Sequence, residues 1–229
     1  MMNGTIEFNV REYDSNVITS LPKGQNLKVN ETKFLDVCIL EEADPIGAQQ
    51  LKTEDIVEEL RKIPDYIRKF IISIVLNPFP HPDPDFFESN IGRKICPLAT
   101  AYSAKGQIII YAVPEERAVL KDTLAKQSTL LHEAGHIIDG IVPKGQERLA
   151  QYLAYTPRWT KAMCEDSKYQ QEMYGRSQYF VSPYAEELNS LREDFADSVR
   201  FFSDGINDEI LKANCPNRCK ILEELLRGS

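Results

Sequence analysis

Two histidines one helical turn apart are the feature that most constrains this chain. His132-Glu133-Ala134-Gly135-His136 is an H-E-x-x-H motif. On an α-helix, residues i and i+4 lie side by side on one face, so two imidazoles can reach one metal ion. Glu133 is rotated by about 60° to 100° from either histidine and would stand beside that ion. The motif predicts a catalytic zinc held by His132 and His136, with Glu133 as the base that takes a proton from zinc-bound water.

The flanking residues place the motif on a long amphipathic helix. An apolar stripe at helical spacing predicts a helix from about residue 115 to residue 140, with Gly140 as its C-terminal stop. The two histidines fall opposite this stripe, where a cleft is expected. Gly135 weakens a helix by about 1 kcal/mol relative to alanine, so we expect it to pack closely against another backbone. The stripe consists of Leu120, Leu124, Leu131 and Ile138.

A catalytic zinc needs a third protein ligand and an open position for water. The extended metzincin motif requires glycine at position 139 and histidine or aspartate at position 142, but the chain has Asp139 and Val142. That subclass is therefore excluded, and a carboxylate from a later helix is expected.

Residues 190–203 are predicted to form the helix that supplies this ligand. Glu193 and Asp197 share one side of it at i and i+4, opposite an apolar stripe. We expect Glu193 to bind the zinc, with Asp194, Asp197 and Glu187 as alternatives. Asp197 would then accept a hydrogen bond from a ligand histidine, a role for which Asp139 competes.

Three segments together resemble a known peptidase family. His132 to Asp139, Val181-Ser182-Pro183-Tyr184-Ala185, and Glu193 to Asp197 look like the catalytic domain of anthrax lethal factor and the related Pro-Pro endopeptidases. The likeness spans roughly residues 95 to 205.

The resemblance implies roles for residues that spacing alone does not assign. It gives Glu193 as the glutamate that completes the zinc site, and Tyr184 as the phenol that stabilises the oxyanion of the tetrahedral intermediate. Tyr179 is the alternative donor. This chain departs from the family pattern in two ways. Asp197 stands where a glutamate is usual, and the interval from Tyr184 to Glu193 is about two residues longer than in that pattern.

The rest of the chain predicts an α+β fold of the zincin-like type. Residues 4–41 alternate apolar and polar and favour a small antiparallel sheet, Ile71 to Leu76 favours a buried strand, and Ala99 to Tyr111 favours a hairpin whose second strand lies at a sheet edge. The last 90 residues read as mainly helical. We therefore expect a β-rich N-terminal segment at 1–50, within the same domain as a zincin-like unit at 51–229 that has a mixed sheet, a motif helix and a helical C-terminal lobe.

Charge and hydropathy exclude some classes of binding partner. A net charge of −8 argues against nucleic acid, since such affinity needs clustered Lys and Arg. No apolar run reaches the roughly 20 residues of a membrane span. The first 30 residues lack a signal-peptide core, and five scattered cysteines suit a reducing compartment, so a cytoplasmic location or export without a recognisable signal peptide is expected.

The combined expectation is an endopeptidase with one catalytic zinc and a protein or peptide substrate. Two alternatives stay open: a toxin or effector protease that acts inside another cell, and a regulatory or binding module that keeps the fold without turnover. Retention of Glu133 speaks against the second.

Overall fold

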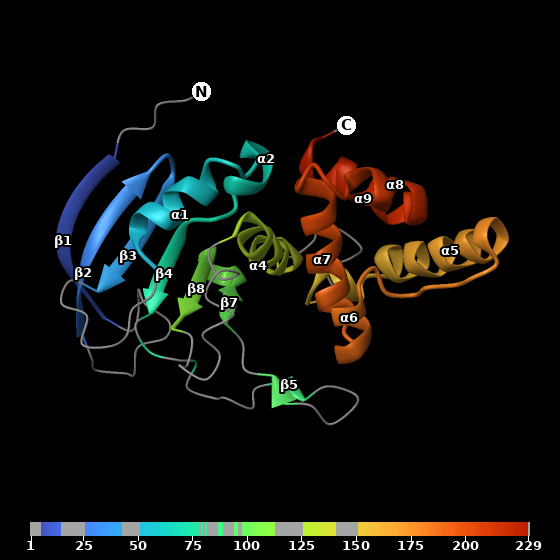
Figure 1. Cartoon of the computed structure of the whole chain (residues 1–229), viewed down its shortest axis with the longest axis horizontal. Helices are drawn as coiled ribbons and strands as arrows, with labels where there is room; N and C mark the ends of the chain where they lie inside the picture. Colours follow the sequence, from blue (N-terminus) through green and yellow to red (C-terminus); the bar gives the residue numbers. More distant parts are fainter. Residues whose placement is uncertain are drawn as a thin grey trace.

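A six-stranded mixed sheet forms one half of the molecule, and helices form the other (Figure 1). This computed structural model describes residues 6–14, 26–42, 51–77, 79, 81, 87–88, 94–95, 98–112, 126–140 and 151–228. The strand order is β1-β2-β3-β4-β8-β7, and β5 and β6 pair separately. The strands are β1 (Ile6–Asp14), β2 (Asn26–Phe34), β3 (Val37–Glu42), β4 (Ser73–Asn77), β5 (Phe87–Glu88), β6 (Lys94–Ile95), β7 (Ala99–Tyr102) and β8 (Gln107–Tyr111).

The sheet changes direction along its width. β1, β2 and β3 pair antiparallel, β3-β4 and β4-β8 pair parallel, and β7 returns antiparallel to β8. The antiparallel arrangement expected for residues 4–41 is thus confirmed where the structure describes it, and these strands continue into the sheet that contains β4. The sheet is mixed, as expected for the α+β class.

The expectation that the strand from Ile108 to Tyr111 lies at a sheet edge is wrong. β8 lies between β4 and β7, and all five of its residues are buried. A continuous apolar run is typical of a strand that is covered on both faces and paired on both sides. The strand at this edge of the sheet is β7, the partner of β8 in the hairpin.

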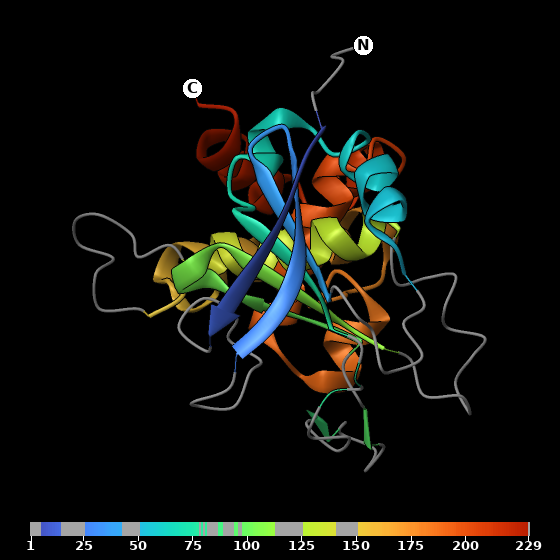
Figure 2. The same ribbon diagram turned by 90° about the vertical axis from the view of Figure 1, so that its left-hand side faces the viewer.

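Two apolar clusters cover the two faces of the sheet. One face packs against α1 (Thr53–Leu60), α2 (Asp65–Arg68) and α4 (Gln127–Asp139), and it carries the larger cluster, which includes Ile74, Ile108 and Ile138. Alternate strand residues, among them Val75 and Ile109, form the second cluster on the other face. Figure 2 shows these helices lying against the twisted strands.

The motif helix is shorter than expected. α4 begins at Gln127, and Lys126 before it is extended, so the helix does not run unbroken from residue 115 to residue 140. Residues 113–125, with Leu120 and Leu124 of the expected stripe, lie outside the described residues. Glu59 of α1 accepts a hydrogen bond from the backbone N–H of Gln127 at 2.8 Å and so caps α4 from another element. A local pattern cannot reveal such a long-range cap.

The C-terminal part is helical, as expected. Of its helices, α7 packs most extensively against α4, and α5 extends away from the sheet (Figure 1). None of the helices that the structure describes combines the length and apolar character needed to cross a bilayer. The elements are η4 (Leu153–Tyr155), α5 (Pro157–Tyr174), α6 (Pro183–Leu188), α7 (Leu191–Ser203), α8 (Asp208–Asn214) and α9 (Pro216–Leu226).

Candidate metal centre

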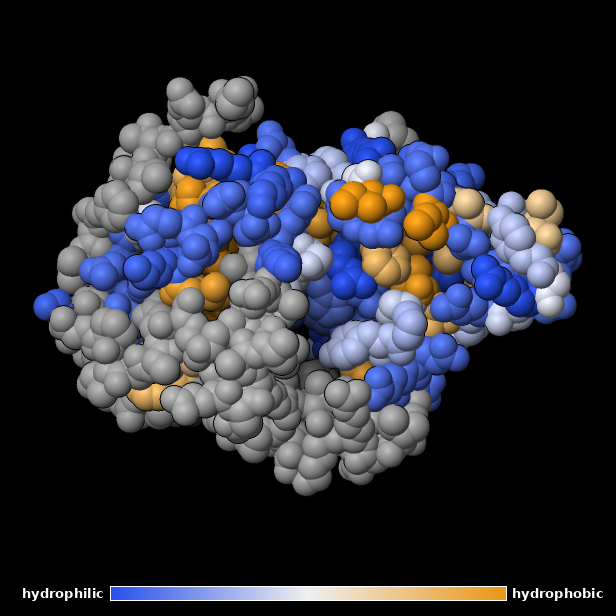
Figure 3. All heavy atoms as spheres, viewed as in Figure 1, coloured by the Kyte–Doolittle hydropathy of each residue, from blue (hydrophilic) through white to orange (hydrophobic). Residues whose placement is uncertain are grey.

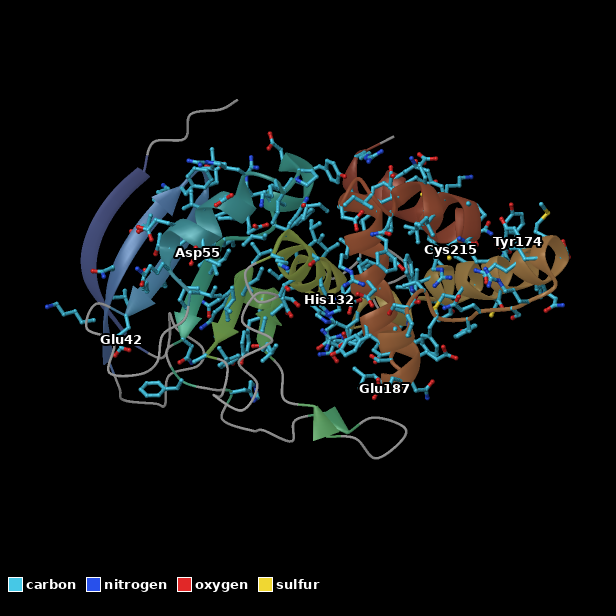
Figure 4. All side chains as sticks on the ribbon, viewed as in Figure 1. Glu42, Asp55, His132, Tyr174, Glu187 and Cys215 are labelled. Carbon is cyan, nitrogen blue, oxygen red and sulfur yellow. The ribbon has the colours of Figure 1, made fainter. Side chains whose placement is uncertain are left out.

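α4 presents both motif histidines to α7. Leu130, Leu131 and Ile138 of α4 are fully buried in the core, whereas His132 and His136 on the other side are only partly covered. The two imidazole rings meet edge to face, with centroids 4.8 Å apart. Figure 4 shows His132 at the place where α4 meets α7.

A glycine allows the two helices to approach closely. A β-carbon built on Gly135 would lie 2.6 Å from the α-carbon of Ala196 and 2.9 Å from its carbonyl oxygen. The expectation that Gly135 packs against another backbone is therefore confirmed. This close approach brings Glu193 of α7 to the histidine face of α4.

The helix that carries Glu193 starts where the sequence predicted. Ser190 caps α7 and accepts a hydrogen bond from the backbone N–H of Glu193 at 3.3 Å. In a capping box the glutamate at this third position turns back toward the cap. Here the Glu193 carboxylate instead lies 3.1 Å from His132 Nε2 and 3.3 Å from His136 Nε2.

The three side chains form a group that could hold a metal ion. Their candidate ligand atoms all lie within 4.8 Å of one another, and no second such group occurs among the described residues. Ligand atoms about 2.0 to 2.1 Å from a tetrahedral zinc are separated by about 3.3 Å, close to the two glutamate distances. The donor set of two imidazoles and one carboxylate is also one that zinc accepts.

Two buried carboxylate oxygens without hydrogen-bond partners also support a metal ion at this place. Oε2 of Glu193, the atom nearest both histidines, is buried without a geometrically acceptable hydrogen bond, and so is Oε2 of Glu133. Both glutamates are 6% exposed. Buried carboxylate oxygens without hydrogen bonds are costly unless a cation or another partner compensates them. The residues present therefore fit a metal ion.

The electrostatics of these residues are strongly coupled. Burial alone would lower the pKa of His132, but its hydrogen bond with Asp197 and the nearby carboxylate of Glu193 raise it to about 10. Burial would raise the pKa of Glu193, yet the two histidines hold it far below its usual value. Burial raises the pKa of Glu133, and the histidines oppose that effect. The site attracts positive charge.

Asp197 orients His132. Its Oδ1 lies 2.8 Å from Nδ1 of His132 and 3.0 Å from Nη2 of Arg200, and its Oδ2 accepts a hydrogen bond from Ser182. Burial would raise the pKa of Asp197, but the hydrogen bond with His132 and the charges of His132 and Arg200 lower it. An ionised Asp197 leaves Nε2 of His132 as the nitrogen that faces Glu193.

Asp139, the other candidate for this role, has different partners. It is fully buried and accepts hydrogen bonds from the backbone N–H of Ala154 at 2.8 Å and from Nε of Arg192 at 2.9 Å. It therefore ties the end of α4 to η4 and to the start of α7. Gly140, which follows it, ends α4 as expected, and a β-carbon there would overlap the side chain of Ser103.

The alternative ligands are not part of the cluster. Asp194 turns away from it and binds Arg218 and the backbone N–H of Val181. Asp197 forms a hydrogen bond with His132 Nδ1 instead. Glu187 lies on α6, where Figure 4 labels it. Among the acidic candidates, Glu193 alone joins both histidines in the described part of the chain.

Tyr184 lies beside the cluster on α6. Its ring centroid is 6.0 Å from that of His132. Burial, followed by the charges of Glu193 and Glu133, raises the pKa of Tyr184 well above its usual value. Burial, followed by Cys164 and the charge of Asp194, raises the pKa of Tyr179, the alternative donor. No ring contact joins Tyr179 to either histidine among the described residues. The structure thus brings Tyr184 rather than Tyr179 to the histidines.

The sequence interpretation overlooked several residues around the cluster. Ser182 caps α6 and binds Asp197, Arg200 binds Asp197, and Ser103 donates to the carbonyl oxygen of His136 at 2.9 Å. Only Ser182 carried a local signal, because a serine followed by proline is typical of a helix start. The others depend on contacts between elements distant in sequence.

The surface between the sheet half and the helical half is hydrophilic, as the blue spheres there show (Figure 3). No protein-family model matches the chain, and no match was found among curated proteins.

Proposed function

We propose that this protein is a zinc-dependent endopeptidase with a zincin-like fold, related to the lethal factor and Pro-Pro endopeptidase family. The observation that carries the proposal is the convergence of His132 Nε2, His136 Nε2 and Glu193 Oε2, together with the buried Glu133, whose Oε2 has no hydrogen-bond partner. Three protein ligands are what a catalytic zinc uses, because the fourth position is then open.

The residues around the cluster divide the chemistry among them. A bound zinc would act as a Lewis acid that polarises the scissile carbonyl and acidifies water. In this proposal Glu133, whose buried Oε2 has no hydrogen-bond partner, would accept a proton from the attacking water and pass it to the leaving amine. Because the pKa of Tyr184 is raised, its phenol keeps its proton and can donate a hydrogen bond to the developing oxyanion.

We propose that the substrate peptide binds along β7. β7 is one of the two edge strands of the described sheet, and it packs against α4; Ser103 just after it donates to the carbonyl oxygen of His136. An extended peptide that adds to β7 by backbone hydrogen bonds would run along the motif helix. Backbone recognition of this kind suits peptide substrates of varied sequence.

The test combines zinc content with cleavage of a peptide library. Wild type is compared with Glu133→Gln and Glu193→Ala, and with Glu172→Ala, which changes an exposed glutamate of α5 far along the chain. We expect one zinc per wild-type chain, zinc without cleavage in Glu133→Gln, loss of zinc in Glu193→Ala, and no effect in Glu172→Ala.

Three outcomes of this test would contradict the proposal. Zinc binding without cleavage of any library peptide by wild type would favour a metal-binding module over an enzyme. Cleavage that persists in Glu133→Gln would remove Glu133 from the mechanism. A wild-type chain that takes up no zinc would overturn the proposed centre altogether.

A further inference from the structure

Ser182 lies between the two parts of the proposed site. On one side its hydroxyl caps α6, the helix of Tyr184; on the other it binds Asp197, the aspartate that orients His132. We propose that Ser182 is a positioning residue that couples the tyrosine helix to the metal-ligand histidine. This inference rests on the proposed function, and it adds a residue that neither the motif nor the ligand set includes.

The hydrogen bonds of Ser182 use its hydroxyl in both directions. A serine hydroxyl has one proton to donate and lone pairs to accept with. Ser182 Oγ donates to Asp197 Oδ2 and accepts from the backbone N–H of Ala185 at 3.1 Å. The side chain is 3% exposed, so water offers little replacement for either bond. A single hydroxyl thus joins α6 to α7.

The geometry of α6 makes this hydroxyl matter for Tyr184. Pro183 occupies the first position of the helix and Tyr184 the second, so the phenol is mounted one residue from the proline and two from the cap. α6 has only six residues, so its orientation depends on contacts with other elements. Its link to Asp197 therefore contributes to where the phenol stands relative to His132, 6.0 Å away between ring centroids.

The same link affects Asp197. Its Oδ1 is shared by His132 and Arg200, while Ser182 donates to Oδ2. Without that donor the carboxylate can rotate or draw in water, and His132 loses a fixed acceptor. Partners that orient a ligand histidine commonly change metal affinity by about 10- to 100-fold when they are removed.

The chain supplies a matched control for the loss of a helix cap. Thr156 precedes Pro157 at the start of α5 as Ser182 precedes Pro183, and Thr156 is also 3% exposed. Its hydroxyl accepts from the backbone N–H of Trp159 at 3.2 Å but donates to the carbonyl oxygen of Leu153 instead of to a carboxylate. Thr156→Ala removes a buried cap without touching the cluster.

The first experiment measures zinc affinity by competition with a chelator for wild type, Ser182→Ala, Ser182→Thr and Thr156→Ala. We expect Ser182→Ala to weaken zinc binding several-fold, by less than the roughly 10-fold expected when Asp197 itself is removed. Ser182→Thr should restore most of the affinity because the hydroxyl returns, and Thr156→Ala should leave it unchanged. In the Asp197→Ala background, Ser182→Ala should add little, because its acceptor is gone. Equal zinc affinity in Ser182→Ala and Thr156→Ala, or effects that multiply in the double variant, would overturn the coupling.

The second experiment needs no metal. Amide hydrogen exchange of the zinc-free protein is compared between wild type and Asp197→Ala, for residues 183–188 of α6 and for α5 as the reference helix. Coupling predicts faster exchange in α6 alone. If wild type fails to bind zinc, the proposed function is lost, yet this exchange result still decides the link: unchanged exchange in α6 would refute it.

Discussion

Gly135 of α4 lies against the backbone of Ala196 in α7, so close that a β-carbon at position 135 would stand 2.6 Å from the Ala196 α-carbon. No pair of real atoms of this kind approaches so closely, and the neighbouring atoms belong to the backbone. The distance between the helices that supply the histidines and Glu193 is therefore set by a missing side chain. This contact also explains why a poor helix former occupies the centre of the motif helix.

Gly135→Ala should damage both stability and the metal centre. Alanine is intrinsically better in a helix by about 1 kcal/mol, but overpacking against α7 costs about 1 to 3 kcal/mol and pushes Glu193 from the histidines. We expect a net loss of unfolding free energy in the zinc-free protein and weaker zinc binding. Urea unfolding and chelator competition measure the two effects. Adding Ala196→Gly should not rescue either, since the clash is with backbone atoms; rescue would show that the Ala196 side chain sets the distance.

The sequence predicted the parts of the site that depend on local spacing. The i and i+4 histidines, the apolar stripe of residues 191–203 and the close packing of Gly135 follow from one helix at a time, and all are found. The start of α4 and the position of β8 could not be predicted in this way. The first depends on Glu59, and the second on parallel pairing with β4.

Asp197 and Asp139 should respond differently to the same substitution. Asp197→Ala removes the acceptor of His132 Nδ1, so we expect zinc affinity to fall on the order of 10-fold. Asp139→Ala leaves the Ala154 N–H and Arg192 without their acceptor, so we expect the zinc-free protein to lose about 2 to 4 kcal/mol of stability.

Zinc affinity should be nearly unchanged in Asp139→Ala once folding is complete. Chelator competition on folded protein and urea unfolding of the zinc-free protein separate the two quantities, because bound metal would itself stabilise the folded state. A tenfold loss of zinc affinity in Asp139→Ala would return Asp139 to the role that the sequence left open for it.

Arg218 should be essential for stability although it lies outside the zinc cluster. It is fully buried and binds Asp166 at 3.0 Å and Asp194 at 2.8 Å, so it joins α9 to α5 and α7. Arg218→Met keeps much of the volume but leaves two buried carboxylates without their cation, which costs about 3 to 5 kcal/mol.

A surface arginine of the same region provides the comparison. Arg158 pairs with Glu224, and both side chains are well exposed. Arg158→Met should cost less than about 1 kcal/mol. Urea unfolding midpoints of the two variants test the difference, and similar losses would mean that burial of Arg218 does not determine its contribution.

The buried network around Arg218 depends on contacts between helices that the sequence alone does not predict. The sequence leaves Asp194 open as an alternative ligand to Glu193, but consecutive helical residues point about 100° apart. Glu193 consequently faces α4, while Asp194 faces α9 and Arg218. A charge pattern gives the type of residue but not the element that will neutralise it.

Stability should fall between about pH 9 and pH 11 because of two buried thiols. Cys215 immediately precedes α9 and Cys219 is its fourth residue, and the two are 3% and 4% exposed. Burial raises the pKa of Cys215 to about 11, an effect that the charge of Arg218 opposes, and burial raises the pKa of Cys219 to about 11. In the unfolded chain these thiols have their ordinary pKa of about 9.0, so the unfolded state is favoured as the pH rises through this window.

The loss should be on the order of 2 kcal/mol for each thiol, and so about 4 kcal/mol for the pair, by pH 10.5. Below pH 9 both states keep the protons, and the contribution is fully present. Urea unfolding under reducing conditions at pH 8 and pH 10.5 measures the loss, and the double variant Cys215→Ala and Cys219→Ala should show a smaller one. Cys164→Ala, which changes an exposed thiol, is the control. Some pH dependence should persist in the double variant, since burial also raises the pKa of Tyr111 to about 12. An identical slope in wild type and the double variant would show that the buried thiols do not produce the effect.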